Sequence, residues 1–221
     1  MSAKPRLAVL VSGSGSNLQA ILNAIRTGHI DAEPAVVLSN RPDALALERA
    51  HKAGVPAEVV DHRAYATREA FDQAMMDVLG RHEPDWVILA GFMRILTPGF
   101  VQAFAGRMLN IHPSLLPRYP GLNTHARALE AGDREAGASV HFVTEALDGG
   151  PVIMQAVVPV MPDDTPEALA ERVLGQEHLL YPEVIRLACA GRLALAGDQV
   201  ELDGRVLTAP LRIENCAVAE A

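Results

Sequence analysis

The chain has 221 residues, 49% of them hydrophobic, with a formal net charge of -8 and a pI of about 5.4. This size predicts one domain with a large core, and the acidic balance without a basic run argues against nucleic acid and membrane surfaces as partners. Cys189 and Cys216 show no CxxC spacing, so we expect a reducing, cytoplasmic location without a disulfide framework or a zinc site. The apolar run Leu7–Val11 is too short for a membrane span and predicts a first strand.

A glycine-rich turn follows this first strand. It reads Ser-Gly-Ser-Gly-Ser-Asn over residues 12–17, and apolar residues at helical spacing continue to Ile25. A strand, glycine-rich turn and helix in this order point backbone N–H groups at an anion. We expect Ser16 or Asn17 to cap the helix or to bond a phosphate oxygen. The alternative is a tight turn without a ligand.

Two known phosphate motifs do not fit this turn. A dinucleotide fingerprint would place a third glycine at Leu18, and the second strand, Ala35–Leu38, would end in Asp or Glu rather than in Ser39-Asn40. No Gly-Lys-Ser/Thr follows, as a Walker A loop would require. The turn therefore favours a single phosphate ester.

Hydrophobic periodicity and turn residues predict an α/β fold whose central, mostly parallel sheet carries helices on both faces. The predicted helices span residues 43–53, 67–79, 98–104, 126–131 and 166–189, the last interrupted near Tyr181-Pro182. The later predicted strands span residues 58–60, 85–90, 108–112, 138–144 and 152–160, with a terminal hairpin at 193–195 and 200–202. The runs 138–144 and 152–160 predict an antiparallel extension, and the chain is expected to fray from about Glu214.

Asn110 and His112 lie at the end of a buried strand, and a proline-rich loop over residues 113–121 follows them. Ligands of open α/β sheets bind outside the carboxyl ends of the strands, and histidine is suited to proton transfer near neutral pH. Two residues apart on a strand, the two side chains share a face. The alternative is that His112 only caps the strand.

A carboxylate in a later turn could join this pair. Asp148 precedes Gly149-Gly150, and a carboxylate beside an imidazole favours the protonated ring. Without a neighbouring Ser or Cys these groups make no nucleophilic triad, but they suit attack by a substrate amine on a carbonyl. The alternative for Asp148 is an ordinary turn residue. A further apolar loop, residues 91–96, would suit a flat ring or would pack on the next helix.

Four motifs in order resemble the phosphoribosylglycinamide formyltransferase family. They are Ser-Gly-Ser-Gly-Ser-Asn-Leu-Gln-Ala from residue 12, Ala-Gly-Phe-Met-Arg-Ile-Leu from 90, Asn-Ile-His-Pro-Ser-Leu-Leu-Pro from 110 and Leu-Asp-Gly-Gly from 147. The resemblance covers about residues 7–190 and implies a Rossmann-like formyltransferase fold. It implies transfer of the formyl group of 10-formyltetrahydrofolate to phosphoribosylglycinamide in purine biosynthesis, without a metal or a covalent enzyme intermediate.

The resemblance also implies roles for individual residues. Asn110, His112 and Asp148 would be catalytic, with His112 as the charged donor and Asp148 as its partner in a proton relay through water. The substrate's phosphate and ribose would meet Gly15, Ser16, Asn17, Gln176 and Glu177. The folate would meet Arg68, Met93, Arg94, Ile95, Leu96, Asn110, Val143, Thr144, Glu145, Ala146, Leu147 and Asp148. A single domain is expected over residues 1–221, with a phosphate-binding half to about 105, a catalytic and folate half to about 190, and a terminal hairpin and tail. We expect a monomer or weak homodimer.

Ser14 and Asn123 depart from the family, whose members often carry Asn and His there.

Among rival families, methionyl-tRNA formyltransferase normally has a further basic domain, for which this chain is too short and too acidic. Formyltetrahydrofolate deformylase usually has an extra N-terminal domain and lacks the Gly-Ser-Asn loop. A non-catalytic nucleotide-binding module would explain the glycine-rich turn but not the placement of Asn110, His112 and Asp148. A nicotinamide dehydrogenase is a further alternative. The absence of a third glycine at Leu18, and of an Asp or Glu after the second strand to bind a ribose hydroxyl, counts against it.

Overall fold

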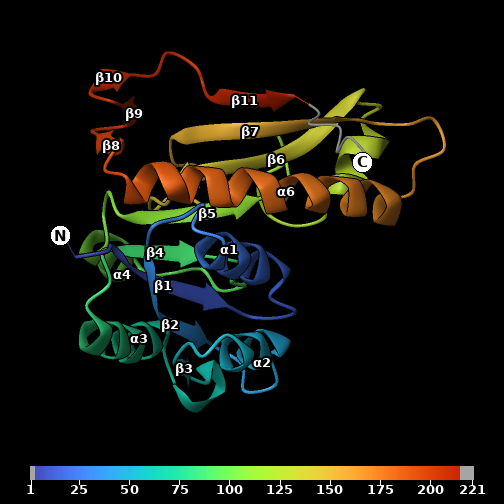
Figure 1. Cartoon of the computed structure of the whole chain (residues 1–221). Coiled ribbons are helices and arrows are strands. Elements are labelled where there is room, and N and C mark those ends of the chain that lie inside the picture. Colours follow the sequence, from blue (N-terminus) through green and yellow to red (C-terminus); the bar gives the residue numbers. More distant parts are fainter. Residues whose placement is uncertain (1–2, 215–221) are drawn as a thin grey trace.

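The computed structural model describes residues 3–214. Its strands are β1 (Arg6–Val11), β2 (Glu33–Ser39), β3 (Ala57–Val59), β4 (Trp86–Leu89), β5 (Met108–His112), β6 (Glu135–Phe142), β7 (Val152–Pro159), β8 (Leu193–Ala196), β9 (Gln199–Leu202), β10 (Arg205–Val206) and β11 (Leu211–Glu214). Its helices are α1 (Ser16–Arg26), α2 (Leu45–Lys52), α3 (Arg68–His82), α4 (Pro98–Ala103), α5 (Thr124–Glu130) and α6 (Pro166–Cys189), with a 3₁₀ turn at His62–Ala64. One sheet has the order β11-β7-β6-β5-β4-β1-β2-β3, and a second has the order β10-β9-β8 (Figure 1).

Both faces of the large sheet are covered, which explains the unbroken apolar run of β1. Leu7 and Val9 pack into the cluster that contains the buried faces of α1 and α6. Ala8 and Leu10 point the other way, into the cluster formed with α3 and α4. Successive strand residues face opposite sides of a sheet, so a strand buried on both sides needs apolar residues throughout.

The predicted mixture of parallel and antiparallel strands is confirmed. β1 pairs in parallel with β2 and β4, and β4 in parallel with β5. β6 pairs antiparallel with both β5 and β7. Two strands that the sequence reading did not predict complete the sheets: β10 extends the terminal hairpin, and β11 pairs in parallel with the outer edge of β7.

The predicted interruption of the last helix is wrong, because α6 runs without a break from Pro166 to Cys189 with Pro182 inside it. A proline in a helix interior removes one hydrogen bond and clashes with the preceding turn. Here Tyr181, Pro182 and Val184 are all buried, and α6 crosses the sheet in front of β5 and β6 (Figure 1). Tertiary packing along this face outweighs the local penalty.

Several predicted boundaries also move by a few residues. The helix predicted from Asp43 begins at Leu45, the one predicted from Ala126 begins at Thr124, and the strand predicted at 138–144 is β6 at 135–142. β6 begins early because its pairing with β7 starts at Glu135, opposite Pro159. The predicted fraying falls mostly on residues 215–221, outside the described residues.

The order of strands brings the residues of interest to one edge. The parallel strands β1, β2, β4 and β5 end at Val11, Ser39, Leu89 and His112, so the loops after them meet at the carboxyl edge of the sheet. Within residues 3–214, no helix combines the length and hydropathy that a membrane crossing requires.

Candidate functional site

The glycine-rich loop, residues 12–17, joins β1 to α1. Gly15 is the N-cap of α1 at φ 71°, and no side chain caps this helix, so the expectation that Ser16 or Asn17 caps it is wrong. A Cβ on Gly15 would lie 2.7 Å from Cβ of Ala46. Only glycine combines this backbone conformation with so close an approach to α2, and the first N–H groups of α1 remain free to meet a ligand.

Helix α2 fixes the glycine-rich loop from behind. The N–H of Ala46 donates to the carbonyl of Gly13 at 3.1 Å. Nε of Arg49 donates to the carbonyl of Ser14 at 2.8 Å. With its carbonyls held on that side, the loop turns its N–H groups and hydroxyls toward the first pocket.

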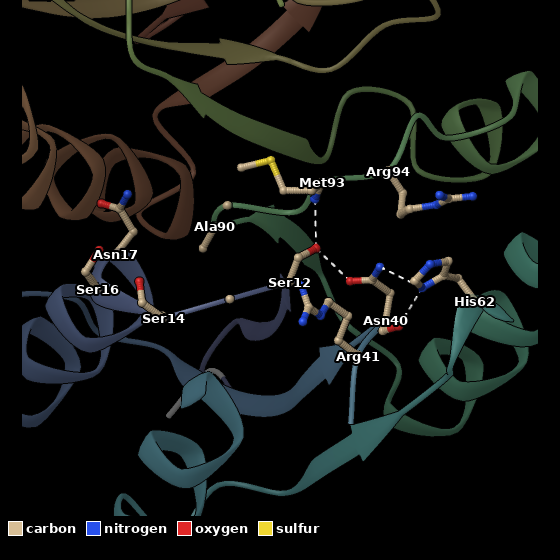
Figure 2. Close-up of a pocket in the computed structure, with 13 residues that line it drawn as sticks. Ser12, Ser14, Ser16, Asn17, Asn40, Arg41, His62, Ala90, Met93 and Arg94 are labelled. Carbon is tan, nitrogen blue, oxygen red and sulfur yellow. Dashed lines mark hydrogen bonds between the residues drawn. The ribbon is translucent and has the colours of Figure 1, made fainter. Parts of the chain in front are cut away.

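The first pocket encloses about 430 Å³ at the carboxyl edge (Figure 2). Its wall consists of Ser12, Gly13, Ser14, Gly15, Ser16, Asn17, Asn40, Arg41, His62, Ala90, Gly91, Met93 and Arg94. The predicted phosphate-loop residues Gly15, Ser16 and Asn17 therefore share one pocket, and Met93, expected at the folate, also lies here.

Asn17 links this pocket to α6. Its Nδ2 donates to Oε2 of the buried Glu177 at 2.7 Å, while its Oδ1 is buried without a hydrogen-bond partner. Burial raises the pKa of Glu177, and the hydrogen bond from Asn17 opposes that rise. Oδ1 of Asn17 is therefore an unsatisfied acceptor for a ligand hydroxyl. Neither Gln176 nor Glu177 lines the first pocket itself, and Oε1 of Gln176 is buried without a partner.

The second pocket lies on the other side of residues 91–96 and encloses about 100 Å³. It is lined by Leu89, Phe92, Arg94, Ile95, Leu96, Val101, Asn110, His141, Val143, Thr144, Glu145, Ala146, Leu147 and Asp148. Most of the predicted folate-binding residues are thus brought together. The exposed Arg68, the first residue of α3, lines neither of these two pockets.

Two of the predicted catalytic residues line the second pocket, and the third, His112, lies beside one of them. Nδ1 of His112 is 3.4 Å from Oδ2 of Asp148, and both side chains are largely buried. The same Oδ2 accepts a hydrogen bond of 2.8 Å from the N–H of Gly121. Asn110 and Asp148 line the second pocket, whereas His112 lines neither pocket.

The contacts of His112 define its hydrogen-bonding state. Nε2 lies 2.9 Å from the carbonyl oxygen of Tyr119, which only accepts, so Nε2 carries a proton. Nδ1 faces a carboxylate. Both ring nitrogens therefore face acceptors, an arrangement that suits an imidazole that donates from both. A substrate oxygen that reaches Nε2 must replace the carbonyl of Tyr119.

His141 is a site residue that the sequence reading missed. Its Nδ1 donates to the carbonyl of Phe142 at 2.8 Å, which leaves Nε2 to accept from Nδ2 of Asn110 at 3.1 Å. This contact orients the Asn110 amide, and Nε2 also lies 3.9 Å from Oδ1 of Asp148. Burial lowers the pKa of His141, which keeps the ring neutral and able to accept.

No cluster of three or more His, Cys, Asp or Glu side chains within residues 3–214 is arranged to hold a metal ion. The site instead offers a glycine-rich loop at a helix N-terminus, a partly apolar second pocket with Asn110 and Asp148 in its wall, and His112 beside Asp148. Arg94 lines both pockets, so an anion and a ring system could bind on either side of it, with groups in the wall of the second pocket that can stabilise an oxyanion.

Comparison with known proteins agrees with this chemistry. A family model described as formyl transferase matches residues 5–185. Phosphoribosylglycinamide formyltransferase from Escherichia coli (strain K12) is 52% identical over 201 residues, which are 91% of this chain and 95% of that protein. The structure of phosphoribosylglycinamide formyltransferase from Coxiella burnetii is 47% identical, with a TM-score of 0.91 over 95% of this chain and 99% of that chain.

A formyltetrahydrofolate deformylase from Pseudomonas syringae is a more distant likeness. It is 27% identical, with a TM-score of 0.83 over 91% of this chain and 66% of that chain. The matched length, the two pockets and the motifs at the carboxyl edge all lead to one assignment: this chain belongs to the formyl transferase family.

Proposed function

We propose that the protein transfers the formyl group of 10-formyltetrahydrofolate to the amine of phosphoribosylglycinamide. The observation that carries this proposal is the position of Asn110 and Asp148 in the wall of the second pocket, with His112 beside Asp148. This pocket shares Arg94 with the first pocket, which the glycine-rich loop lines. Relatives named phosphoribosylglycinamide formyltransferase support it.

The first pocket would take the glycinamide substrate. Its phosphate would meet the free N–H groups of the glycine-rich loop and Ser16, and its ribose hydroxyls would meet Asn17 and Glu177. Gln176, one residue before Glu177, would complete this end of the site. A phosphate monoester suits a helix N-terminus whose N–H groups have no side-chain cap.

The second pocket would take the folate. Its 100 Å³ is below the ~300–1,000 Å³ typical of ligand sites, so the pocket must widen for a pteridine ring to enter. Ile95 and Leu147 in its wall have exposed side chains. Arg94 lines both pockets, and together with Arg68 at the start of α3 it would meet the carboxylates of the folate tail.

The reaction would proceed by direct attack. The substrate amine forms a bond to the formyl carbon, and the bond from that carbon to N10 of the folate breaks. Asn110 and protonated His112 would donate to the formyl oxygen while it carries negative charge. Asp148 would hold His112 and pass the amine proton, through water, to N10 of the departing tetrahydrofolate.

The test follows release of tetrahydrofolate from 10-formyltetrahydrofolate, with and without phosphoribosylglycinamide. Release that requires the acceptor is expected, whereas release without it would indicate a deformylase. His112→Ala should lower kcat by about two to three orders of magnitude, because one oxyanion donor is lost. Unchanged turnover in this variant, or no release by the wild type, would overturn the proposal.

A cytoplasmic location and a monomer or weak homodimer stay predictions. Size-exclusion chromatography with light scattering over a range of protein concentrations would measure the oligomeric state.

A further inference from the structure

Residues 91–97 form one loop that serves as a wall for both pockets. Met93 lines the first pocket, Ile95 and Leu96 line the second, and Arg94 lines both. Met93, Arg94 and Ile95 are exposed, so their side chains receive little support from packing. Phe92 and Leu96 pack against the core on either side of them. The position of the exposed residues 93–95 therefore also depends on how the backbone is held.

A buried hydroxyl of the glycine-rich loop holds the first end. The N–H of Met93 donates to Oγ of Ser12 at 2.8 Å, and that hydroxyl donates to Oδ1 of Asn40 at 2.6 Å. Only 5% of Ser12 and 2% of Asn40 is exposed. Nδ1 of His62 lies 2.9 Å from the carbonyl of Asn40, so the chain of contacts continues across the pocket floor (Figure 2).

A buried carboxylate holds the other end. The N–H of Thr97 donates to Oδ2 of Asp72 at 2.6 Å, and Asp72 is 1% exposed. Asp72 belongs to α3, and Thr97 is the N-cap residue of α4. Besides the packing of Phe92 and Leu96, the loop is therefore held by one hydrogen bond in the wall of the first pocket and by a second beside the second pocket.

We propose that Ser12 and Asp72 are positioning residues of this enzyme, and that Ser12 couples the two substrate sites. The inference rests on the proposed function, because it requires one substrate in each pocket. A ligand on one side of a shared wall orders that wall, and a second ligand on the other side then binds with a smaller entropy loss. Ser12 is the contact through which a ligand on the glycine-rich loop orders the folate side.

The test measures the dissociation constant of tetrahydrofolate by calorimetry, alone and with saturating phosphoribosylglycinamide. The wild type should bind tetrahydrofolate at least about 5-fold more tightly when the second ligand is present, the lower range of typical coupling. In Ser12→Ala, which frees Met93, the ratio should fall to about 1, and in Ser12→Thr, which keeps a hydroxyl, it should recover.

Ser39→Ala is the matched control. Ser39 is also a fully buried serine at the end of a neighbouring strand, but its hydroxyl bonds only the backbone of Arg41. This variant should keep the wild-type ratio. If Ser12→Ala does not fold, Ser12→Cys replaces the hydroxyl by a weaker acceptor of similar shape.

Asp72 should affect the binding of 10-formyltetrahydrofolate but not that of phosphoribosylglycinamide. Asp72→Ala should raise the KM for 10-formyltetrahydrofolate by about 10-fold, as loss of a hydrogen bond to a charged group predicts. The KM for phosphoribosylglycinamide should change less than about 2-fold. Asp72→Asn keeps an acceptor for the N–H of Thr97 and should restore the folate KM.

Different results would overturn the proposed function and the positioning roles of Ser12 and Asp72. Wild-type turnover with no coupling between the ligands, or full coupling in Ser12→Ala, would overturn the role of Ser12 and leave the transferase assignment intact. Equal changes of both KM values in Asp72→Ala would overturn the one-sided role of Asp72. Absence of turnover in the wild type would overturn the function itself.

Discussion

Asp148 is held in a conformation that an asparagine would share. Its φ is 49°, in the left-handed region that Asn and Asp tolerate better than other residues with side chains. Oδ2 accepts from the N–H of Gly121 and faces Nδ1 of His112. Replacement by Asn therefore changes the charge at this position while the shape and the turn are kept.

Asp148→Asn should lower kcat by about two to three orders of magnitude, because Nδ1 of His112 would then face a neutral amide instead of a carboxylate. Both KM values should change by less than about 3-fold, since the substrates' own contacts remain. Steady-state kinetics against each substrate measure this. Asp203→Asn is the control, because Asp203 has φ 53° and also precedes a glycine but lies on the exposed terminal hairpin. A change in KM alone would assign Asp148 to binding.

Asn110, His112 and Asp148, the proposed catalytic residues, could be singled out in the sequence because each stands beside a strand end or turn. His141 could not, since its role depends on the register between β5 and β6, which places it opposite Asn110. The intervening chain includes a long proline-rich loop and α5, and no local signal in it fixes this register. The histidine within an apolar strand was the available signal.

The buried ring of His141 should make stability depend on pH. Burial lowers its pKa below the usual 6.5, so the unfolded chain binds the proton more tightly than the folded one. The stabilising contribution is complete above pH 6.5, the usual histidine pKa, and is lost as the pH falls through the lower, folded pKa.

His141→Asn should therefore reduce the loss of unfolding free energy between about pH 7.5 and pH 5. Urea unfolding at several pH values measures this slope for the wild type and the variant. His51→Asn, at an exposed histidine, should keep the wild-type slope. His125 and His178, whose pKa values burial also lowers, should maintain part of the slope in every variant. An identical slope in His141→Asn would contradict this account.

At the scale of elements, α6 is held to the sheet by a buried hydroxyl. The Tyr181 side chain is fully buried, and its oxygen lies 2.9 Å from the carbonyl of Leu89 and 3.0 Å from that of Leu109. These carbonyls belong to β4 and β5, the strands that are followed by residues 91–96 and by the proline-rich loop. The sequence shows Tyr181-Pro182 as a helix breaker, and this contact adds to the buried packing around Pro182 that keeps the helix continuous.

Tyr181→Phe should lower the free energy of unfolding by about 1–3 kcal/mol, because a buried hydrogen bond is lost while the ring still fills its space. Denaturant unfolding measures this change. Tyr65→Phe is a matched control, since its ring packs edge-on against Phe71 but it is only half-buried. A Tyr181→Phe variant as stable as the wild type would show that the hydroxyl contributes nothing to the seating of α6.

At the scale of the whole molecule, the sequence was most informative where structure is local. The central strands and the helix predicted over residues 67–79, which is α3, follow from patterns of a few residues, and the structure confirms them. Contacts between distant segments were not predictable, among them Asn17 with Glu177, Ser12 with Met93, and Asp72 with Thr97. These contacts hold the walls of both pockets, so the exact shape of the site depends on the completed fold.

The terminal segment protects an edge of the main sheet. β11 pairs with the outer edge of β7 from Leu211 opposite Met154 to Glu214 opposite Val157, and Leu211 and Ile213 pack against the core. Neither this strand nor the β8–β10 sheet lines either of the two pockets. An unpaired sheet edge is a template for pairing with another chain.

In a chain that ends at Thr208, the free energy of unfolding should therefore be lower by about 1–3 kcal/mol. This chain should also self-associate through the exposed edge of β7. Its kcat at low temperature and protein concentration should equal that of the full chain, because no residue of β11 lines either pocket. Denaturant unfolding, light scattering and turnover measure the three quantities, and a chain that ends at residue 214 is the control.

If the shorter chain stayed as stable and as soluble as this control, the terminal strand would have no protective role. A lower kcat with unchanged stability would instead mean that β11 supports the site through β7 and β6, the strand that carries His141.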